Sequence, residues 1–300
     1  MEFKHITIAG SGVLGSQIAF QTAFNGFHVT VYDINDVALQ SAKDKINILK
    51  GRYQEDLQAS KEQVDSASDR ISYYSDLAKA VADADLLIEA IPEIVTIKTE
   101  FYEKLNQVAP DKTVFASNSS TLMPSQFAGA TGRPEKFLAL HFANEIWINN
   151  TAEIMKHPGT DMNVFDQVVE FAKAIGMVAL PLHKEQPGYI LNSLLVPLLD
   201  AAELLLSREV ADVETIDKTW MIATGAPKGP FAILDVVGIK TSYNIVKAKA
   251  DATGNSEFKK LAELLKTEYV DKGKLGVATG EGFYKYPNPR FMDPDFLGNQ

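Results

Sequence analysis

The sequence predicts an α/β protein in which a doubly wound, open parallel sheet is followed by an all-α C-terminal domain. Over residues 1–185, short apolar runs of strand length alternate with stretches of helical period. Near the N-terminus, one strand pattern is joined to one helix pattern by the segment Gly10-Ser11-Gly12-Val13-Leu14-Gly15. Beyond the break at Glu185-Gln186-Pro187-Gly188, the patterns are helical. We therefore expect two domains, over residues 1–185 and 186–300.

The glycine-rich segment has the spacing and the surroundings of a dinucleotide-binding loop. Ile6–Ala9 alternates like a short strand, and Ser16–Asn25 carries apolar residues spaced for one helix face. In such a loop Gly10 permits the tight turn, Gly12 lets the backbone approach a pyrophosphate, and Gly15 lets helix and strand pack closely. The free N–H groups of the helix N-terminus then face the anion. These features predict the phosphate-binding turn of a Rossmann-type domain.

The second predicted strand, His28–Tyr32, is followed by an acidic residue. Asp33 lies eighteen residues after Gly15, where a carboxylate can bind the ribose hydroxyls. The 2′-phosphate of NADP would face this carboxylate, and Ile34-Asn35-Asp36 offers no arginine to neutralise it. NAD is therefore the expected cofactor. The alternative is an ordinary glycine-rich turn followed by a helix-capping aspartate.

The remainder of the first domain continues the alternation of strands and helices. The apolar run Leu86–Ile91 has strand length and ends at Pro92. Residues 58–69 are polar, and we expect a surface loop or helix tip there. In chain order, the other expected elements are a helix over Val37–Leu57, a strand over Ile71–Tyr74, a helix over Val95–Val108, strands over Lys112–Ala116, Phe137–Phe142 and Ala152–Met155, a helix over Asn163–Ala174 and a strand over Met177–Leu182.

The predicted second domain begins with Ile190–Leu206, a segment that is apolar almost all round. This pattern indicates a helix buried on several sides or lying at a subunit interface. Pro197, Asp200 and Glu203 interrupt the segment, which is shorter than a full apolar span, so we expect no membrane-spanning helix. A helix over Asp212–Thr224, a turn over residues 225–230, a helix from Phe231 onwards and a glycine-rich tail over Gly273–Tyr286 complete the domain.

Composition and charge exclude several classes of function. The 300 residues include no cysteine, which excludes disulfides, a thiol nucleophile and a thiolate metal site. The five histidines lack the spacing of metal ligands, so we expect no metal. A net charge of −10 without a basic stripe argues against binding to nucleic acid. No charged stretch followed by an apolar one begins the sequence, and we expect a cytoplasmic protein.

His141 is the residue best placed for proton transfer. It lies near the end of an apolar strand pattern, and ligands of open parallel sheets collect at the carboxyl ends of the strands, where Pro92-Glu93 and residues 118–120 also fall. An imidazole can take or give a proton near neutral pH, as hydride transfer at a carbinol requires. Glu153, in the adjoining strand segment, can accept a hydrogen bond from the far ring nitrogen. The alternative is a histidine satisfied within the core.

The chain resembles the 3-hydroxyacyl-CoA dehydrogenase family over nearly its whole length. The resemblance implies a two-domain NAD enzyme, usually a dimer through its helical C-terminal domain, that reversibly oxidises a 3-hydroxyacyl thioester to the 3-oxo form. The matching blocks are, in order, Gly10–Gly15, Ile88-Glu89-Ala90-Ile91, Phe115-Ala116-Ser117-Asn118-Ser119-Ser120, Leu140-His141-Phe142, Pro187-Gly188-Tyr189-Ile190-Leu191-Asn192 and Gly280-Glu281-Gly282-Phe283-Tyr284.

The resemblance also implies roles for individual residues. The catalytic histidine of the family falls on His141 and its paired glutamate on Glu153, while Ser120 and Asn192 fall on positions that bind substrate oxygens. The cofactor-lining positions are Gly10, Gly12, Val13, Leu14, Gly15, Asp33, Glu93, Lys98 and Asn118. Without the family, Glu93 and Lys98 would fit a surface helix pair, and Ser120 or Asn192 would fit a helix cap.

One block departs from the family pattern. After His141-Phe142 the family usually continues Phe-Asn-Pro and then a Met-Lys pair, whereas this chain has Ala143-Asn144-Glu145-Ile146-Trp147-Ile148-Asn149-Asn150. We expect the change to bear on the acyl carrier, because the pocket gains Trp147 and a glutamate and loses a lysine. With residues 192–202 and 224–231, the block resembles the diketoreductase branch of the family, whose members reduce free dioxo esters.

Three functions therefore stay open at this point. The first is an NAD-dependent dehydrogenase of short-chain 3-hydroxyacyl-CoA thioesters. The second is a reductase of free 3-oxo or 3,5-dioxo acids or esters that uses the same mechanism. The third is a non-catalytic NAD-binding or structural protein.

Overall fold

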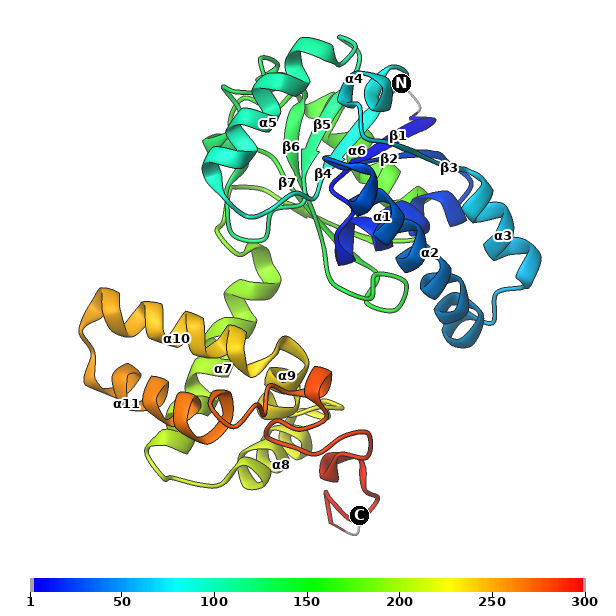
Figure 1. The fold of residues 1–300 in the computed structure, drawn as a ribbon. Helices are drawn as coiled ribbons and strands as arrows, with labels where there is room; N and C mark the ends of the chain where they lie inside the picture. The colour runs from blue at the N-terminus through cyan, green and yellow to red at the C-terminus, as the bar shows by residue number, and fades with distance from the viewer. Residues whose placement is uncertain (1–2, 299–300) are drawn as a thin grey trace. The chain divides into compact units, whose positions relative to one another are not determined.

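A computed structural model describes residues 3–298 and divides the chain into two compact units (Figure 1). The division falls after Ile190, inside helix α7, whereas the sequence places the domain boundary after residue 185. Each unit has its own hydrophobic core. The first holds the sheet, and the second is built of helices.

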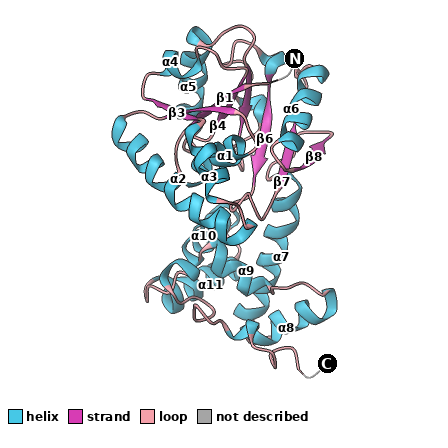
Figure 2. Cartoon of the chain, turned by 90° about the vertical axis from the view of Figure 1, so that its right-hand side faces the viewer, coloured by secondary structure: helices cyan, strands magenta, loops and turns pink. Residues whose placement is uncertain are grey.

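The first unit contains an eight-stranded sheet in the order β3-β2-β1-β4-β5-β6-β7-β8. Figure 2 shows the strands in magenta with helices around them. The sequence order reverses between β1 and β4, which is the switch point of a doubly wound sheet. All neighbouring strands are parallel except β6 and β7, which are antiparallel. The strands are β1 His5–Ala9, β2 His28–Tyr32, β3 Ile71–Tyr74, β4 Leu86–Glu89, β5 Val114–Ser117, β6 Phe137–Phe142, β7 Thr151–Met155 and β8 Val178–Leu182.

Helices cover both faces of the sheet, as the predicted fold class requires. One core cluster joins the sheet to α1, α2, α3 and α6, and a second cluster joins it to α4 and α5. The six helices are α1 Val13–Phe24, α2 Asp36–Leu57, α3 Lys61–Asp69, α4 Leu77–Val81, α5 Val95–Val108 and α6 Met162–Ala174. The predicted doubly wound α/β architecture is confirmed.

Two local features differ from the expectations. Residues 61–69 form a separate helix, α3, rather than a surface loop or the tip of the preceding helix, because Ser60 and Gln63 make a reciprocal capping box and Val64 and Ala67 are buried. The β6–β7 connection spans only residues 143–150, which is too short for a crossover between parallel strands. The antiparallel pairing that results sets His141 directly opposite Glu153.

The second unit is helical, apart from isolated bridges at Glu281, as predicted. Asp235 holds the C-terminal segment on the helices, since its carboxylate accepts bonds from the backbone N–H groups of Phe283 (2.8 Å) and Tyr284 (2.9 Å). The elements are α7 Tyr189–Ser207, α8 Val213–Thr224, α9 Pro230–Val237, α10 Ile239–Thr253, α11 Ser256–Leu265, a π turn over Lys266–Val270 and 3₁₀ turns over Val277–Thr279 and Arg290–Met292.

Helix α7 is long and apolar enough to cross a membrane by length and composition alone. Its two acidic residues nevertheless bond to another helix of the second unit. Glu203 is 1% exposed and accepts a hydrogen bond from the Ser242 hydroxyl on α10, and Asp200 pairs with Lys249 on the same helix. These contacts are those of a helix packed within a helical domain, and the absence of a membrane span stays a prediction.

The buried carboxyl of Glu203 predicts a pH-dependent stability. Burial raises its pKa to about 7, and the bond from Ser242 only partly offsets that burial. Because the folded-state pKa lies above the unfolded value, the carboxyl contributes stability that is complete below about pH 4.5 and lost as pH rises through about 7. The free energy of unfolding of Glu203→Gln, taken relative to that of wild type, is expected to rise by up to roughly 3 kcal/mol from pH 5 to pH 8. Urea unfolding of both proteins at the two pH values measures this difference, and parallel pH profiles would refute the assignment.

Candidate active site

A cavity of about 410 Å³ lies at the carboxyl ends of the central strands β1, β4 and β5. This position is the topological switch point, where doubly wound sheets bind their ligands. Its lining joins the glycine-rich loop to the segments that follow β4 and β5. The lining residues are Gly12, Val13, Leu14, Gly15, Ala90, Ile91, Glu93, Lys98, Asn118 and Ser120.

The three glycines of the loop are required for different reasons. Gly10 has φ +97°, and a Cβ there would lie 2.5 Å from the carbonyl oxygen of Ala90. A Cβ on Gly15 would lie 2.0 Å from the carbonyl oxygen of Gly10. A Cβ on Gly12 would meet no protein atom within 4 Å. Packing therefore requires glycine at the two outer positions, whereas Gly12 faces open space that a pyrophosphate can occupy.

Asp33 is bonded to this loop. Its Oδ2 accepts hydrogen bonds from the backbone N–H of Ser11 (2.8 Å) and from the Ser11 hydroxyl (2.5 Å), and its Oδ1 accepts one from the N–H of Ile34 (2.7 Å). The N-cap of α2 is Asn35, which accepts from the N–H of Ala38. Asp33 is thus not the helix cap, and it is held beside the phosphate-binding turn, where an acid can reach the ribose.

Lys98 lies beneath the cavity at the centre of a buried charge network. Its ammonium group is 2.5 Å from Glu89 Oε1 and 3.4 Å from Glu93 Oε2, and the side chain is 1% exposed. A surface helix pair is therefore the wrong interpretation of Glu93 and Lys98. Glu89 also accepts bonds from the hydroxyls of Tyr102 (2.9 Å) and Ser117 (2.8 Å). Four donors, counting the N–H of residue 91, hold this buried carboxylate.

The carboxylate of Glu93 is fixed over the same network. Burial by itself would raise the pKa of Glu93, but hydrogen bonds from Ser119 and Thr121 and the charge of Lys98 outweigh it and lower the pKa. Glu93 Oε1 accepts from the Ser119 hydroxyl at 2.6 Å and from the Thr121 N–H at 2.8 Å. The segment after β5 is thereby tied to the segment after β4.

Glu89 is not among the site residues that the sequence predicts, although an acid inside an apolar strand pattern is a usable signal.

Ser120, His141 and Glu153 form a hydrogen-bonded chain. Glu153 Oε2 lies 3.1 Å from His141 Nδ1, and the Ser120 hydroxyl lies 3.2 Å from His141 Nε2. Both the imidazole and the glutamate are buried, at 6% and 3% exposed. A Glu153 carboxylate accepts from Nδ1–H, which leaves Nε2 as the basic nitrogen on the side of Ser120, a residue that lines the cavity. This is the geometry of an acid–base pair aimed at a ligand site.

The capping alternatives for the polar residues are wrong. No helix begins at Ser120, because the next 3₁₀ turn is Pro124–Gln126 with Met123 at its N-cap. Asn192 is the fourth residue of α7 and is not its N-cap. Asn118 is 8% exposed and accepts from the N–H of Phe142 (3.0 Å), which connects β5 to β6. Asn192 lies in the second unit, so its role toward the substrate stays a prediction.

The structure corrects the expectation for Trp147. Its indole ring is 7% exposed and belongs to the core of the first unit, where Nε1–H donates to Asp56 at 2.8 Å and the guanidinium of Arg52 lies over the ring. Glu145 is 3.5 Å from the same arginine. Residues 143–150 are thus tied to α2, and the indole does not add to a substrate pocket because its apolar contacts are already made.

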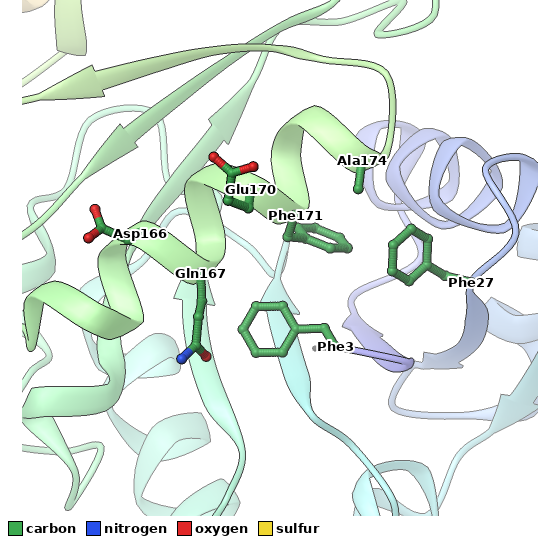
Figure 3. A pocket seen from close by; sticks show the side chains of 7 residues that line it. All are labelled: Phe3, Phe27, Asp166, Gln167, Glu170, Phe171 and Ala174. Carbon is green, nitrogen blue, oxygen red and sulfur yellow. The ribbon is translucent and has the colours of Figure 1, made fainter. Parts of the chain in front are cut away.

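A second hollow, of about 530 Å³, contains none of these residues (Figure 3). Three phenyl rings, Phe3, Phe27 and Phe171, line it together with Asp166 and other residues of α6. Phe3 and Phe27 precede β1 and β2, so this hollow lies at the amino ends of strands, away from the switch point. Among residues 3–298, no group of three or more His, Asp or Glu side chains is arranged to hold a metal ion.

Family models match both parts of the chain. Residues 5–186 match the NAD binding domain of 3-hydroxyacyl-CoA dehydrogenase, and residues 188–286 match its C-terminal domain. The open space at Gly12, the cavity that Gly12 lines and the acid Asp33, which is bonded to the same loop, fit a dinucleotide. NAD is therefore the cofactor of this chain.

Known proteins are similar over almost the full length. The human mitochondrial hydroxyacyl-coenzyme A dehydrogenase is 35% identical over 94% of this chain and 91% of its own. A probable 3-hydroxybutyryl-CoA dehydrogenase of Bacillus subtilis is 32% identical over 95% of this chain and 98% of its own. A solved diketoreductase, described as catalysing reactions of dicarbonyl compounds, is 56% identical with a TM-score of 0.91 and covers 95% of this chain and 100% of its own. The chain belongs to the 3-hydroxyacyl-CoA dehydrogenase family, and it is an NAD-dependent oxidoreductase acting on a CH–OH group.

Proposed function

We propose that the protein interconverts a short-chain 3-hydroxyacyl-CoA and the corresponding 3-oxoacyl-CoA, with His141 as general acid and base and Glu153 as its partner. The observation that carries this proposal is the hydrogen-bonded chain from buried Glu153 through His141 to Ser120, a residue of the cavity lining. The buried carboxylate bonds to the imidazole, and the imidazole bonds to a residue that lines the cavity. Proton transfer to a bound ligand needs this order.

Bound NAD supplies the acceptor or donor of the hydride at the reacting carbon. In the oxidation, Nε2 of His141 takes the proton of the 3-hydroxyl group, and the carboxylate of Glu153 stabilises the imidazolium that forms. Ser120 donates to a substrate oxygen and holds it in line with the imidazole, and we assign Asn192 the same task. The cofactor is held by Gly10, Gly12, Val13, Leu14, Gly15, Asp33, Glu93, Lys98 and Asn118.

The second candidate substrate is a free 3-oxo or 3,5-dioxo acid or ester. Its support is the 56% identity to the diketoreductase, well above the 35% identity to the human thioester enzyme. The reacting group is the same ketone or carbinol, so the acid–base pair works identically for either acyl carrier. Only the groups that bind the remainder of the substrate distinguish the two candidates.

A substrate panel separates the two candidates. Acetoacetyl-CoA and a free 3-oxo ester are each reduced under identical conditions and followed by the loss of NADH absorbance. The CoA proposal expects a higher kcat/KM with the thioester. Turnover of the ester without turnover of the thioester would discard it in favour of the second candidate, and no turnover of either by folded, NADH-binding protein would favour a non-catalytic role.

Asp33 is expected to set the preference for NAD. Asp33→Ala removes the carboxylate that repels a 2′-phosphate and can bind the ribose hydroxyls, so the ratio of kcat/KM for NADH over NADPH should fall on the order of tenfold or more. Asp33→Asn is the matched control for the bonds to Ser11, because its amide oxygen still accepts from the loop. An unchanged cofactor ratio in Asp33→Ala would remove Asp33 from the ribose site.

We further propose a cytoplasmic homodimer in fatty acid metabolism, associated through the helical second unit, without binding to nucleic acid or membrane. Exposed apolar side chains on the helices of that unit, such as Leu194 (70% exposed) and Val236 (59%), support an interface there. Light scattering is expected to give twice the mass of one chain, and a monomer at micromolar concentration would contradict the dimer.

A further inference from the structure

The aromatic ring of Tyr189 covers one face of the His141 imidazole. The two ring centroids are 4.5 Å apart and the planes differ by 13°, which is a stacked arrangement. The tyrosine is 1% exposed, and its hydroxyl donates to the carbonyl oxygen of Ser119 at 2.7 Å. Burial, and then the nearby glutamates Glu93 and Glu153, raise the pKa of this phenol, so the hydroxyl stays protonated and remains a donor.

The backbone around Tyr189 is held in an unusual conformation. Gly188 and Tyr189 both have positive φ, +78° and +54°, although an aromatic residue rarely adopts the left-handed region. The next N–H, that of Ile190, donates to Glu153 Oε1 at 2.9 Å. The two oxygens of Glu153 thus bind the imidazole and the chain just after the tyrosine. Such strain persists where the surroundings fix the conformation, and it concentrates at functional sites.

The contacts of Tyr189 add to the restraint that hydrogen bonds place on the imidazole. Glu153 and Ser120 hold the two ring nitrogens, and both bonds lie along the ring edge. Bonds in the plane of the ring resist sliding more strongly than they resist a tilt of the ring plane by rotation about the Cβ–Cγ bond. The stacked ring of Tyr189 opposes that tilt. Its hydroxyl fixes the tyrosine itself to Ser119, the neighbour of the serine that Nε2 faces.

We propose that Tyr189 is a positioning residue for the reaction. Its ring holds the plane of the His141 imidazole, and its hydroxyl, which is bonded to Ser119, sets the distance of the imidazole from Ser120. The inference rests on the proposed function, because a tilt of the imidazole affects turnover only if Nε2 transfers the proton. All of the groups involved lie in the first unit.

Two variants separate the two contacts. Tyr189→Leu removes the ring, and kcat is expected to fall about tenfold to a hundredfold, while the KM for substrate and the Kd for NADH change less than about threefold. Tyr189→Phe keeps the stacking and loses only the bond to Ser119, so kcat should fall about threefold to tenfold. The intermediate phenylalanine value is a partial rescue that distinguishes ring placement from simple loss of packing.

Tyr53 provides a matched control for buried packing. It is also a fully buried tyrosine of the first unit, but its hydroxyl donates to Gln21 Oε1 and its ring packs against Phe20, Phe24 and Trp147 rather than against His141. Tyr53→Leu should lower the melting temperature as much as Tyr189→Leu does, yet leave kcat near that of wild type. Equal losses of kcat in the two leucine variants would overturn the positioning role.

A spectroscopic measurement decides the matter if Tyr189→Leu does not fold. The imidazole of His141 is stacked on the tyrosine ring, so the NMR signals of its ring protons should be shifted upfield in wild type and nearly as far in Tyr189→Phe. An unshifted signal, or wild-type kcat in Tyr189→Phe, would overturn the proposal. If His141→Ala keeps full activity, the proposed function fails; if it abolishes turnover while Tyr189→Leu is folded and fully active, only the present inference fails.

Discussion

His141→Ala is expected to lower kcat by about a hundredfold or more while the affinity for NADH stays nearly intact. The imidazole bonds to Glu153 and Ser120, whereas the dinucleotide cavity is lined by the glycine-rich loop and the segments after β4 and β5. Removing the ring therefore removes the proton acceptor without removing a cofactor contact. Steady-state reduction of the better substrate gives kcat, and quenching of protein fluorescence by NADH gives the Kd.

His157→Ala is the matched control for that experiment. His157 is also 6% exposed in the first unit, and its ring bonds to the carbonyl of Pro134 and to the N–H of Gly159. Its loss should lower stability and leave kcat unchanged. An NADH affinity that falls as far as kcat in His141→Ala would contradict the acid–base assignment, because the imidazole would then be a cofactor contact.

Much of this site can be predicted from the sequence because its residues lie at or just after the ends of strands. Gly10, Gly12, Gly15 and Asp33 are predictable since a βαβ unit fixes where a pyrophosphate and a ribose lie. His141 is predictable as a titratable residue near the end of an apolar strand. The antiparallel turn between β6 and β7 is different, because no pattern states strand direction; only the shortness of the connection excludes a crossover.

Three-dimensional contacts explain what the sequence leaves open. Trp147 looks like a change in the substrate pocket because it follows His141 closely, but its indole is bonded to Asp56, ninety-one positions earlier in the chain. Tyr189 is forty-eight positions after His141, so its stacking has no local signal. Side-chain direction and long-range pairing decide these cases, and neither has a period that can be read along the chain.

Gly12→Ala and Gly15→Ala are expected to impair the protein in different ways. A Cβ at Gly12 meets no protein atom within 4 Å, so the fold should tolerate it, but it would occupy the space that the pyrophosphate needs. We expect an unchanged melting temperature and an NADH affinity weakened at least about tenfold, or 1.4 kcal/mol. A Cβ at Gly15 would lie 2.0 Å from the Gly10 carbonyl oxygen, so the loop itself must shift.

Gly15→Ala should therefore lower the free energy of unfolding by about 1–3 kcal/mol, because of overpacking, and it should also bind NADH more weakly. Gly51→Ala is the control, because Gly51 lies within α2 with open space around it, and alanine there should be neutral or slightly stabilising. Thermal unfolding and NADH titration of the three variants show whether each added Cβ clashes with the cofactor or with the protein itself. If Gly12→Ala binds NADH as well as wild type does, the pyrophosphate cannot approach the backbone there, and the cavity beside Gly12 is not the cofactor site.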